Sequence, residues 1–159
     1  MTATLPTLTS PLETSQAILQ ASVETAFGQS IEGIKAIITH READTQTAAL
    51  NQILIETIVD HIKTLLDLPQ KETMDLIGTS ASQKSRNKIV NLEIADRSFI
   101  VLEVFARISA KMGEERARTW IKSPKKALNN RTPLELLNTR VGLQELDEYL
   151  NALEDGAYS

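Results

Sequence analysis

The sequence contains no cysteine and few aromatic residues, and both shortages limit what the protein can be. Without cysteine among its 159 residues, the chain can form neither a disulfide framework nor a thiolate metal site. Three Phe, two Tyr and one Trp are few for a strand-rich sandwich, whereas abundant Leu, Ile, Ala, Glu and Lys favour packed helices. The sequence also lacks an apolar run long enough to span a membrane and a secretion signal near its start. We therefore expect an all-α protein in the reducing cytoplasm, with no membrane partner.

The charge balance is slightly acidic, with 17 Lys and Arg against 21 Asp and Glu and a formal net charge of −4. This balance argues against a general nucleic-acid binder, although a local basic face can coexist with an acidic whole. The distribution of charge along the chain therefore matters more than the total.

Helix signals recur along the chain, usually as an apolar stripe bounded by a capping residue or a glycine. Ser10, Pro11 and Glu13 form one such start, and Gly28 supplies the stop. Residues 1–9 are expected to form a mobile tail, and residues 31–38 fit a helix or a short β-rich stretch. The helices expected with more support cover residues 11–27, 47–66 as one long helix, 70–77, 81–89, 92–112, about 117–121, 132–137, and a last one after Gly142 running to about 154.

The region from 70 to 89 predicts a helix, a tight turn and a second helix. Gly78 can take the left-handed conformation that ends a helix, and no acidic residue lies between Asp75 and Glu93. In a recognition helix, cations would contact phosphates and polar side chains would read base edges, although a solvated basic helix is the simpler alternative. The predicted DNA-binding residues are Ser82, Gln83, Lys84, Arg86, Asn87 and Lys88.

The C-terminal third offers one aromatic anchor and one acidic end. Trp120 is most simply a core anchor, with a place at a protein interface as the minority alternative. The end of the chain holds no base after Arg140, so its carboxylates either solubilise the protein or mimic an anionic ligand. A second basic region, residues 107–126, is expected to be a solvated face that could steer a partner. The carboxylates concerned are Glu145, Asp147, Glu148, Glu154 and Asp155.

Catalytic patterns are missing from the sequence. His40 and His61 do not follow a metal-ligand spacing, and the chain has neither a glycine-rich phosphate loop nor a cysteine nucleophile. Both histidines are predicted to be surface or capping residues. We therefore expect no enzyme activity, no metal and no cofactor.

Between about residue 91 and residue 159 the chain carries a tryptophan helix, a proline turn, a capped Thr-Pro-Leu-Glu-Leu-Leu segment and a late glycine, in that order. The residues concerned are Ala117–Ile121, Ser123 and Pro124, Ala127 and Leu128, Asn130–Leu137, Gly142, Leu150 and Gly156. In these residues and in their order, the chain resembles the toxin-binding domain of the Xre/MbcA/ParS antitoxin family.

The resemblance implies a type II antitoxin that silences a toxin of the RES or ParT type, which consumes or transfers the ADP-ribose part of NAD. It also implies a helix-turn-helix in residues 10–90, a toxin-binding domain in residues 91–159, repression of the antitoxin's own operon, and a dimer or higher oligomer. Inhibition would come from the C-terminal region placed at the entrance of the toxin's active site. The expected toxin-binding residues are Trp120, Leu134, Glu154, Asp155, Tyr158 and Ser159.

Two other interpretations remain open at this point. The chain could be a stand-alone DNA-binding regulator with no toxin partner. It could also be a pure inhibitor that has lost operator binding, because Thr79 and Lys84 stand where helix-turn-helix motifs usually offer apolar packing positions.

Overall fold

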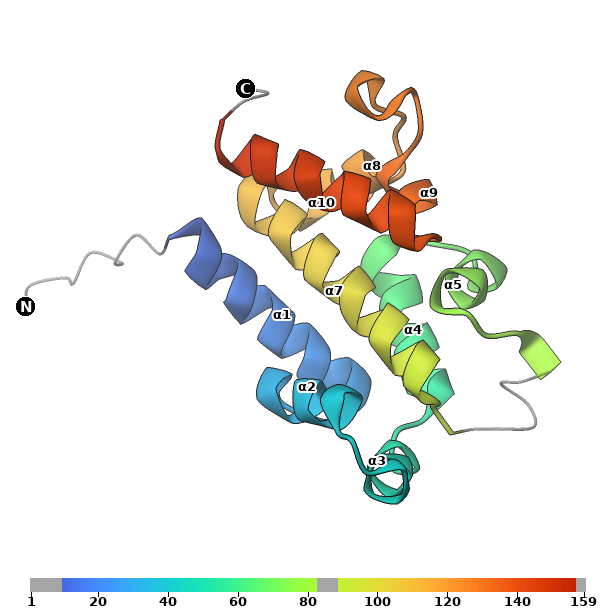
Figure 1. The fold of residues 1–159 in the computed structure, drawn as a ribbon. Coiled ribbons are helices and arrows are strands. Elements are labelled where there is room, and N and C mark those ends of the chain that lie inside the picture. The colour runs from blue at the N-terminus through green and yellow to red at the C-terminus, as the bar shows by residue number, and fades with distance from the viewer. Residues whose placement is uncertain (1–9, 83–88, 157–159) are drawn as a thin grey trace, which may run out of the picture.

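The computed structural model describes residues 10–82 and 89–156, and within these ranges the fold is all-α, as predicted (Figure 1). Isolated β-bridges join Leu54 to Ile89 and Lys125 to Arg131. The predicted mobile tail, residues 1–9, lies outside the described residues. The helices are α1 Pro11–Phe27, α2 Ile31–Thr39, α3 Ala43–Leu50, α4 Ile55–Leu66, α5 Gln70–Ile77, α7 Leu92–Met112, α8 Glu114–Ile121, the short 3₁₀ helix η1 Lys126–Leu128, α9 Pro133–Leu136 and α10 Arg140–Glu154.

Helix α7 lies at the centre of the fold, and α1 packs beside it (Figure 1). Helix α4 packs against α1, and α5 packs against α7. Helix α10 lies near the C-terminal end of α7. Its inward face carries Ile94, Leu102, Phe105 and Ile108, each at most 2% exposed. Burying a side chain of this size contributes about 1.5–3 kcal/mol. The buried cluster includes residues from both sides of residue 90, so α7 connects the N-terminal helices to the C-terminal ones.

Local capping explains where most helices begin and end. Ser10 and Glu13 form the predicted capping box at α1, and Thr132 and Glu135 form another at α9. Asn91 caps α7 through a hydrogen bond from the Ile94 amide, as predicted. The ambiguous segment 31–38 is helical, because the Ser30 hydroxyl accepts a hydrogen bond from the amide of Gly33 and caps α2.

The prediction of one helix over residues 47–66 is wrong. Helix α3 ends at Leu50, and α4 begins at Ile55 after a turn and an extended residue, Leu54. The amide of Val90 donates a hydrogen bond of 3.2 Å to the carbonyl oxygen of Ile53, so a segment distant in sequence pairs with this break. Ile53 and Ile55 are both buried. The apolar spacing was compatible with a helix, but this long-range pairing and packing determine the local structure.

The last helix begins earlier than predicted. Helix α10 starts at Arg140, capped by the Thr139 hydroxyl, so Gly142 lies inside it as its third residue. A Cβ atom on Gly142 would lie 2.5 Å from the carbonyl oxygen of Leu136. Glycine therefore lets α10 approach the backbone at the end of α9.

The two histidines differ in environment. His40 ends α2, and its Nδ1 accepts a hydrogen bond from the amide of Glu42, which confirms its predicted capping role. For His61 that prediction is wrong, because its Nε2 is buried and has no hydrogen-bond partner among the described residues. Burial lowers the pKa of the His61 imidazole, which favours the neutral form.

Among the described helices, none is long and apolar enough to cross a membrane.

Candidate functional site

Trp120 lies in a stack of side chains from three segments of the C-terminal region. Its ring stacks on that of Tyr149 from α10, with centroids 6.0 Å apart and planes within 7°. The Lys125 ammonium lies 4.6 Å from the Trp120 ring centroid, a cation–π contact. Burial lowers the pKa of this ammonium. We call Trp120, Lys125 and Tyr149 the aromatic platform.

The aromatic platform is only partly buried. Trp120 packs against the core, as predicted, but part of its side chain stays exposed, whereas Ala117 and Ile121 on the same helix are fully buried. Leu134 on α9 is also partly buried. Beside Trp120 a hollow of about 550 Å³ is lined by side chains that include Arg116, and this corner combines aromatic, apolar and cationic groups. Such a mixture is common at protein interfaces.

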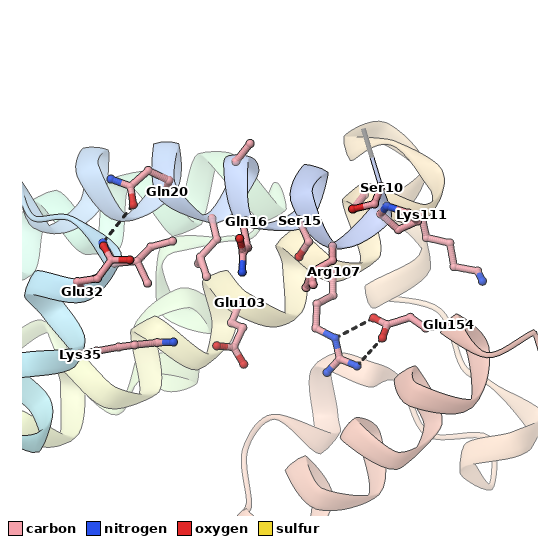
Figure 2. Close-up of a pocket in the computed structure, with 16 residues that line it drawn as sticks. Ser10, Ser15, Gln16, Gln20, Glu32, Lys35, Glu103, Arg107, Lys111 and Glu154 are labelled. Atoms are coloured by element: carbon pink, nitrogen blue, oxygen red, sulfur yellow. Dashed lines mark hydrogen bonds and ion pairs between the residues drawn. The ribbon is translucent and has the colours of Figure 1, made fainter. Parts of the chain in front are cut away.

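A groove of about 1030 Å³ runs along the seam between α1 and α7 (Figure 2). It is lined by α1 from Ser10 to Gln20, by Ile31, Glu32 and Lys35 of α2, by α7 between Glu103 and Lys111, and by Glu154 of α10. Figure 2 shows Gln20, Glu32 and Lys35 at one end and Ser10, Arg107, Lys111 and Glu154 at the other. We call this feature the α1–α7 groove.

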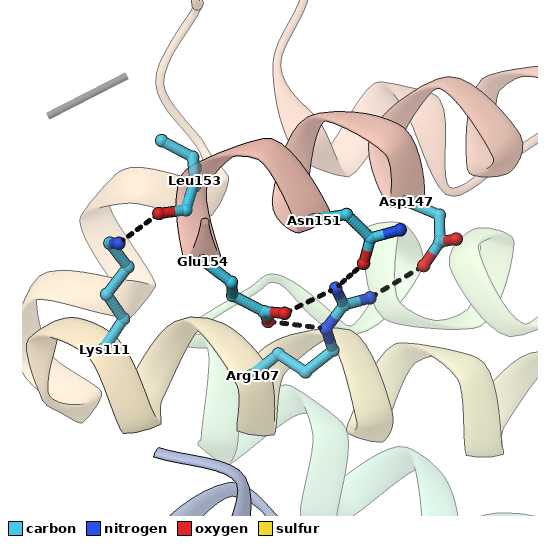
Figure 3. A network of polar contacts seen from close by, with 6 residues as sticks. All are labelled: Arg107, Lys111, Asp147, Asn151, Leu153 and Glu154. Carbon is cyan, nitrogen blue, oxygen red and sulfur yellow. Dashed lines mark hydrogen bonds and ion pairs between the residues drawn. The ribbon is translucent and has the colours of Figure 1, made fainter. Parts of the chain in front are cut away.

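Arg107 of α7 binds the C-terminal half of α10 through several hydrogen bonds (Figure 3). Its guanidinium donates to Asp147 at 2.7 Å, to Asn151 at 2.7 Å and to Glu154 at 2.9 and 3.2 Å. Burial alone would lower the pKa of Arg107, but the hydrogen bonds and charges of Glu154 and Asp147 outweigh it and raise the pKa. Lys111 donates a hydrogen bond of 2.6 Å to the carbonyl oxygen of Leu153. We call Arg107, Lys111 and their partners on α10 the α10 latch.

The α10 latch uses carboxylates that the sequence assigned to the acidic end of the chain. Glu154 and Asp147 share Arg107, and Glu145 pairs with Arg131, so each of these carboxylates already has a cationic partner within the chain. Asp155 is exposed and takes part in no ion pair that the described ranges contain. Of the six expected toxin-binding residues, two, Tyr158 and Ser159, lie outside the described residues.

The second basic region is not simply a solvated face. The Nε atom of Arg118 donates to the carbonyl oxygen of Leu65 at 2.7 Å, and the Lys122 ammonium donates to the carbonyl oxygen of Asp67 at 3.1 Å. These carbonyls lie at the C-terminal end of α4, where the helix dipole favours a positive charge. Arg118 and Lys122, which were predicted to be surface cations, therefore link α8 to the end of α4. The groups in contact are more than fifty positions apart in the sequence, so no local pattern predicts this link.

The predicted DNA-binding residues are mostly beyond what the structure describes. The helix predicted for residues 70–77 and the glycine predicted to end it are confirmed, because α5 ends at Ile77 and Gly78 follows it with a left-handed φ of 80°. Thr79 is buried, at 6% exposed, so this threonine occupies a packing position although its hydroxyl has no partner in the described ranges. Ser82 is exposed. Outside the described residues lie Gln83, Lys84, Arg86, Asn87 and Lys88.

Within residues 10–82 and 89–156, no three His, Asp or Glu side chains are grouped so as to hold a metal ion.

Comparison with known proteins places the aromatic platform and the α10 latch in one domain. Residues 105–156 match the family model described as the antitoxin Xre/MbcA/ParS C-terminal toxin-binding domain. The chain is also 28% identical over 81 residues to the Antitoxin Xre of Pseudomonas putida (strain KT2440). That alignment covers 50% of this chain and 51% of the relative, so the chain spans about half the length of the curated relative that it matches. Residues 105–156 are therefore similar to the C-terminal toxin-binding domain of the Xre/MbcA/ParS antitoxin family.

Proposed function

We propose that the chain is the antitoxin of a type II toxin–antitoxin module and that it inhibits a toxin that consumes NAD or transfers its ADP-ribose part. The observation that carries the proposal is the match of residues 105–156 to a toxin-binding domain. The toxin docks on α8, α9 and α10, with Trp120 and Leu134 in contact. The chain then acts by binding, without catalysis and without a cofactor.

The exposed part of the aromatic platform supports this docking site. Trp120 contacts both the Tyr149 ring and the Lys125 ammonium, and these contacts restrict its side chain before any partner arrives. A preorganised aromatic side chain loses little conformational entropy on binding and is a frequent interface hot spot. The neighbouring hollow beside Arg116 and Met112 gives a partner side chain room to insert.

The α10 latch supports inhibition by the end of the chain. Arg107 and Lys111 fix the last turn of α10, so the residues that follow Glu154 leave the domain from a defined point. The acceptor groups in this segment of the sequence are the carboxylate of Asp155 and the hydroxyl groups of Tyr158 and Ser159. We propose that this segment enters the cationic pocket in which the toxin binds the pyrophosphate of NAD.

The test is co-expression of the full chain with the toxin encoded by the neighbouring gene. We expect growth and cellular NAD to stay at the level of cells without toxin, because a stoichiometric complex removes free toxin. The toxin expressed alone should arrest growth and deplete NAD. If the two proteins do not co-purify and growth still stops, the chain is instead a stand-alone regulator.

We propose in addition that the chain represses its own operon by binding operator DNA as a dimer. The acid-free run between Asp75 and Glu93 supports this proposal, together with helix α5 and the left-handed Gly78 that ends it. A dimer pairs two recognition segments on a palindromic operator.

Operator binding is expected to be strongly salt-dependent. With three cations per subunit on phosphates, a dimer releases about six counterions, so log affinity falls against log salt concentration with a slope of about −5. Replacing Lys84, Arg86 and Lys88 together with alanine should abolish gel retardation of the upstream operator and leave toxin binding intact. Lys63→Ala, at an exposed cation of α4, is the control that should retain retardation. Undiminished retardation by the triple variant would refute the assignment of this segment.

A further inference from the structure

The α1–α7 groove has the dimensions and the lining of a peptide-docking site. Its α1 wall runs from Ser10 to Gln20, a rise of about 15 Å at 1.5 Å per residue, or nearly three helical turns. Ala17 of α1, Ile31 of α2 and Ala110 of α7 provide small and apolar surface along this length, and the buried Leu19 lies beneath it. Leu12, at 69% exposed, lies on the lining near one end. An apolar segment of a partner can therefore bury its side chains here.

The charged groups of the groove differ in whether they already have partners. Arg107 and Glu154 bind each other at one end, so the α10 latch leaves little charge for a partner there. Glu103, which projects into the middle of the groove in Figure 2, has no ion pair in the described ranges. Lys35 at the other end lies 5.8 Å from the ring centroid of Phe99. Beside its apolar surface the groove thus presents the carboxylate of Glu103 in its middle and, at its other end, the ammonium of Lys35 together with the carboxylate of Glu32.

We propose that the α1–α7 groove is a second docking site for the toxin, which rests on the proposed function of the chain as an antitoxin. It receives an apolar segment of the toxin that carries a cation opposite Glu103 and an acidic side chain opposite Lys35. The toxin is then held at two places, by the α8–α10 surface and by this groove.

The groove is continuous with the toxin-binding domain, and this continuity identifies the occupant. Arg107, Ala110, Lys111 and Glu154 line the groove and also fall within residues 105–156. Glu154 directly precedes the segment that we propose to enter the active site of the toxin. A toxin engaged by that segment therefore lies at the open end of the groove.

The remaining wall of the groove comes from helices outside the matched domain. Helices α1 and α2 supply Ala17, Leu19, Glu32 and Lys35, all of which precede residue 105. Two antitoxins with similar C-terminal domains can differ at these positions. The groove consequently acts as a specificity element that restricts the chain to its own toxin.

The test compares two arginine substitutions one turn apart on α1. Ala17 and Ala21 are both exposed, but Ala17 lines the groove and Ala21 does not. Arginine is a good helix former, so neither change should unfold α1. By titration calorimetry with a catalytically inactive variant of the neighbouring toxin, we expect Ala17→Arg to weaken binding about tenfold or more and Ala21→Arg by less than about twofold. Glu103→Lys, a charge reversal within the groove, should also weaken binding. Thermal melting confirms that each variant is folded.

The outcomes separate this inference from the proposed function. If the unaltered chain does not bind the toxin, both are refuted. If it binds and Ala17→Arg binds equally well, the groove is not a docking site, whereas the antitoxin function stands. If Ala17→Arg splits a dimer into monomers with unchanged toxin affinity, as seen by light scattering, the groove is occupied by a second copy of the chain and our assignment is wrong.

Discussion

Removing residues 155–159 is expected to leave a protein that still binds the toxin but no longer silences it. The deletion begins after the α10 latch, so Arg107 keeps its bonds to Asp147 and Glu154, and the core keeps Leu153. Only the segment proposed to occupy the nucleotide pocket is lost, together with its charge-assisted hydrogen bonds. In cells that co-express the neighbouring toxin, NAD should fall and growth should stop although the two proteins co-purify.

A length-matched variant shows whether the chemistry of this segment matters or only its bulk. Replacing residues 155–159 with Gly and Ser keeps five residues but removes Asp155 and Tyr158. If the carboxylate and the aromatic ring are the active groups, this variant should also fail to protect. Full protection by the shortened chain would move inhibition to the surface around Trp120 and Leu134 and leave the acidic end a solubilising role.

The helix boundaries that the sequence predicted correctly depend on neighbouring residues. Ser10 with Glu13 and Thr132 with Glu135 form capping boxes within a single turn, and Gly78 stops its helix through its own backbone. Such signals need only three or four residues and are visible without any tertiary contact. This is why most helices and the all-α class could be predicted.

The features that could not be predicted depend on contacts between distant residues. The break between α3 and α4 is accompanied by pairing of Val90 with Ile53, and the apolar spacing of residues 47–66 does not contain that information. The α10 latch joins Arg107 to residues 40 to 47 positions later, so the sequence showed Glu154 only as part of an acidic end. His61 was misassigned because packing of its helix half-buries the side chain and covers its Nε2 atom.

The segments that form the candidate site could be named from the sequence because the resemblance extends over them. Trp120, Leu134 and Gly142 were all named from the sequence, but their geometry was not. Tyr149 and Lys125, which hold Trp120 in place, had no signal of their own. A lysine in a turn and a tyrosine on a helix are ordinary surface residues until the fold places them beside a tryptophan.

Gly142→Ala is expected to destabilise the protein, although alanine normally favours a helix over glycine by about 1 kcal/mol. The new Cβ would lie 2.5 Å from the carbonyl oxygen and 3.0 Å from the Cα of Leu136. Both atoms belong to the backbone, so no side-chain rotation can relieve the overlap, and α9 and α10 must separate. Overpacking of this kind costs about 1–3 kcal/mol, equivalent to a melting temperature lowered by roughly 2–12 °C for a chain of this length.

Gly33→Ala is the matched control, because Gly33 occupies the same position in α2 as Gly142 does in α10. Each is the third residue of its helix, and each donates its amide to the hydroxyl of the N-cap, Ser30 or Thr139. A Cβ on Gly33 would meet only side-chain atoms, at 3.1 Å from Gln29 and from the Ser30 hydroxyl, and these can shift by a few tenths of an ångström. Calorimetric melting should therefore show Gly33→Ala unchanged or slightly stabilised and Gly142→Ala clearly destabilised. Because α9 carries Leu134, the Gly142 variant should also bind the toxin more weakly at a temperature where it remains folded. Equal melting temperatures for the two variants would mean that α9 and α10 are not in tight contact at this glycine.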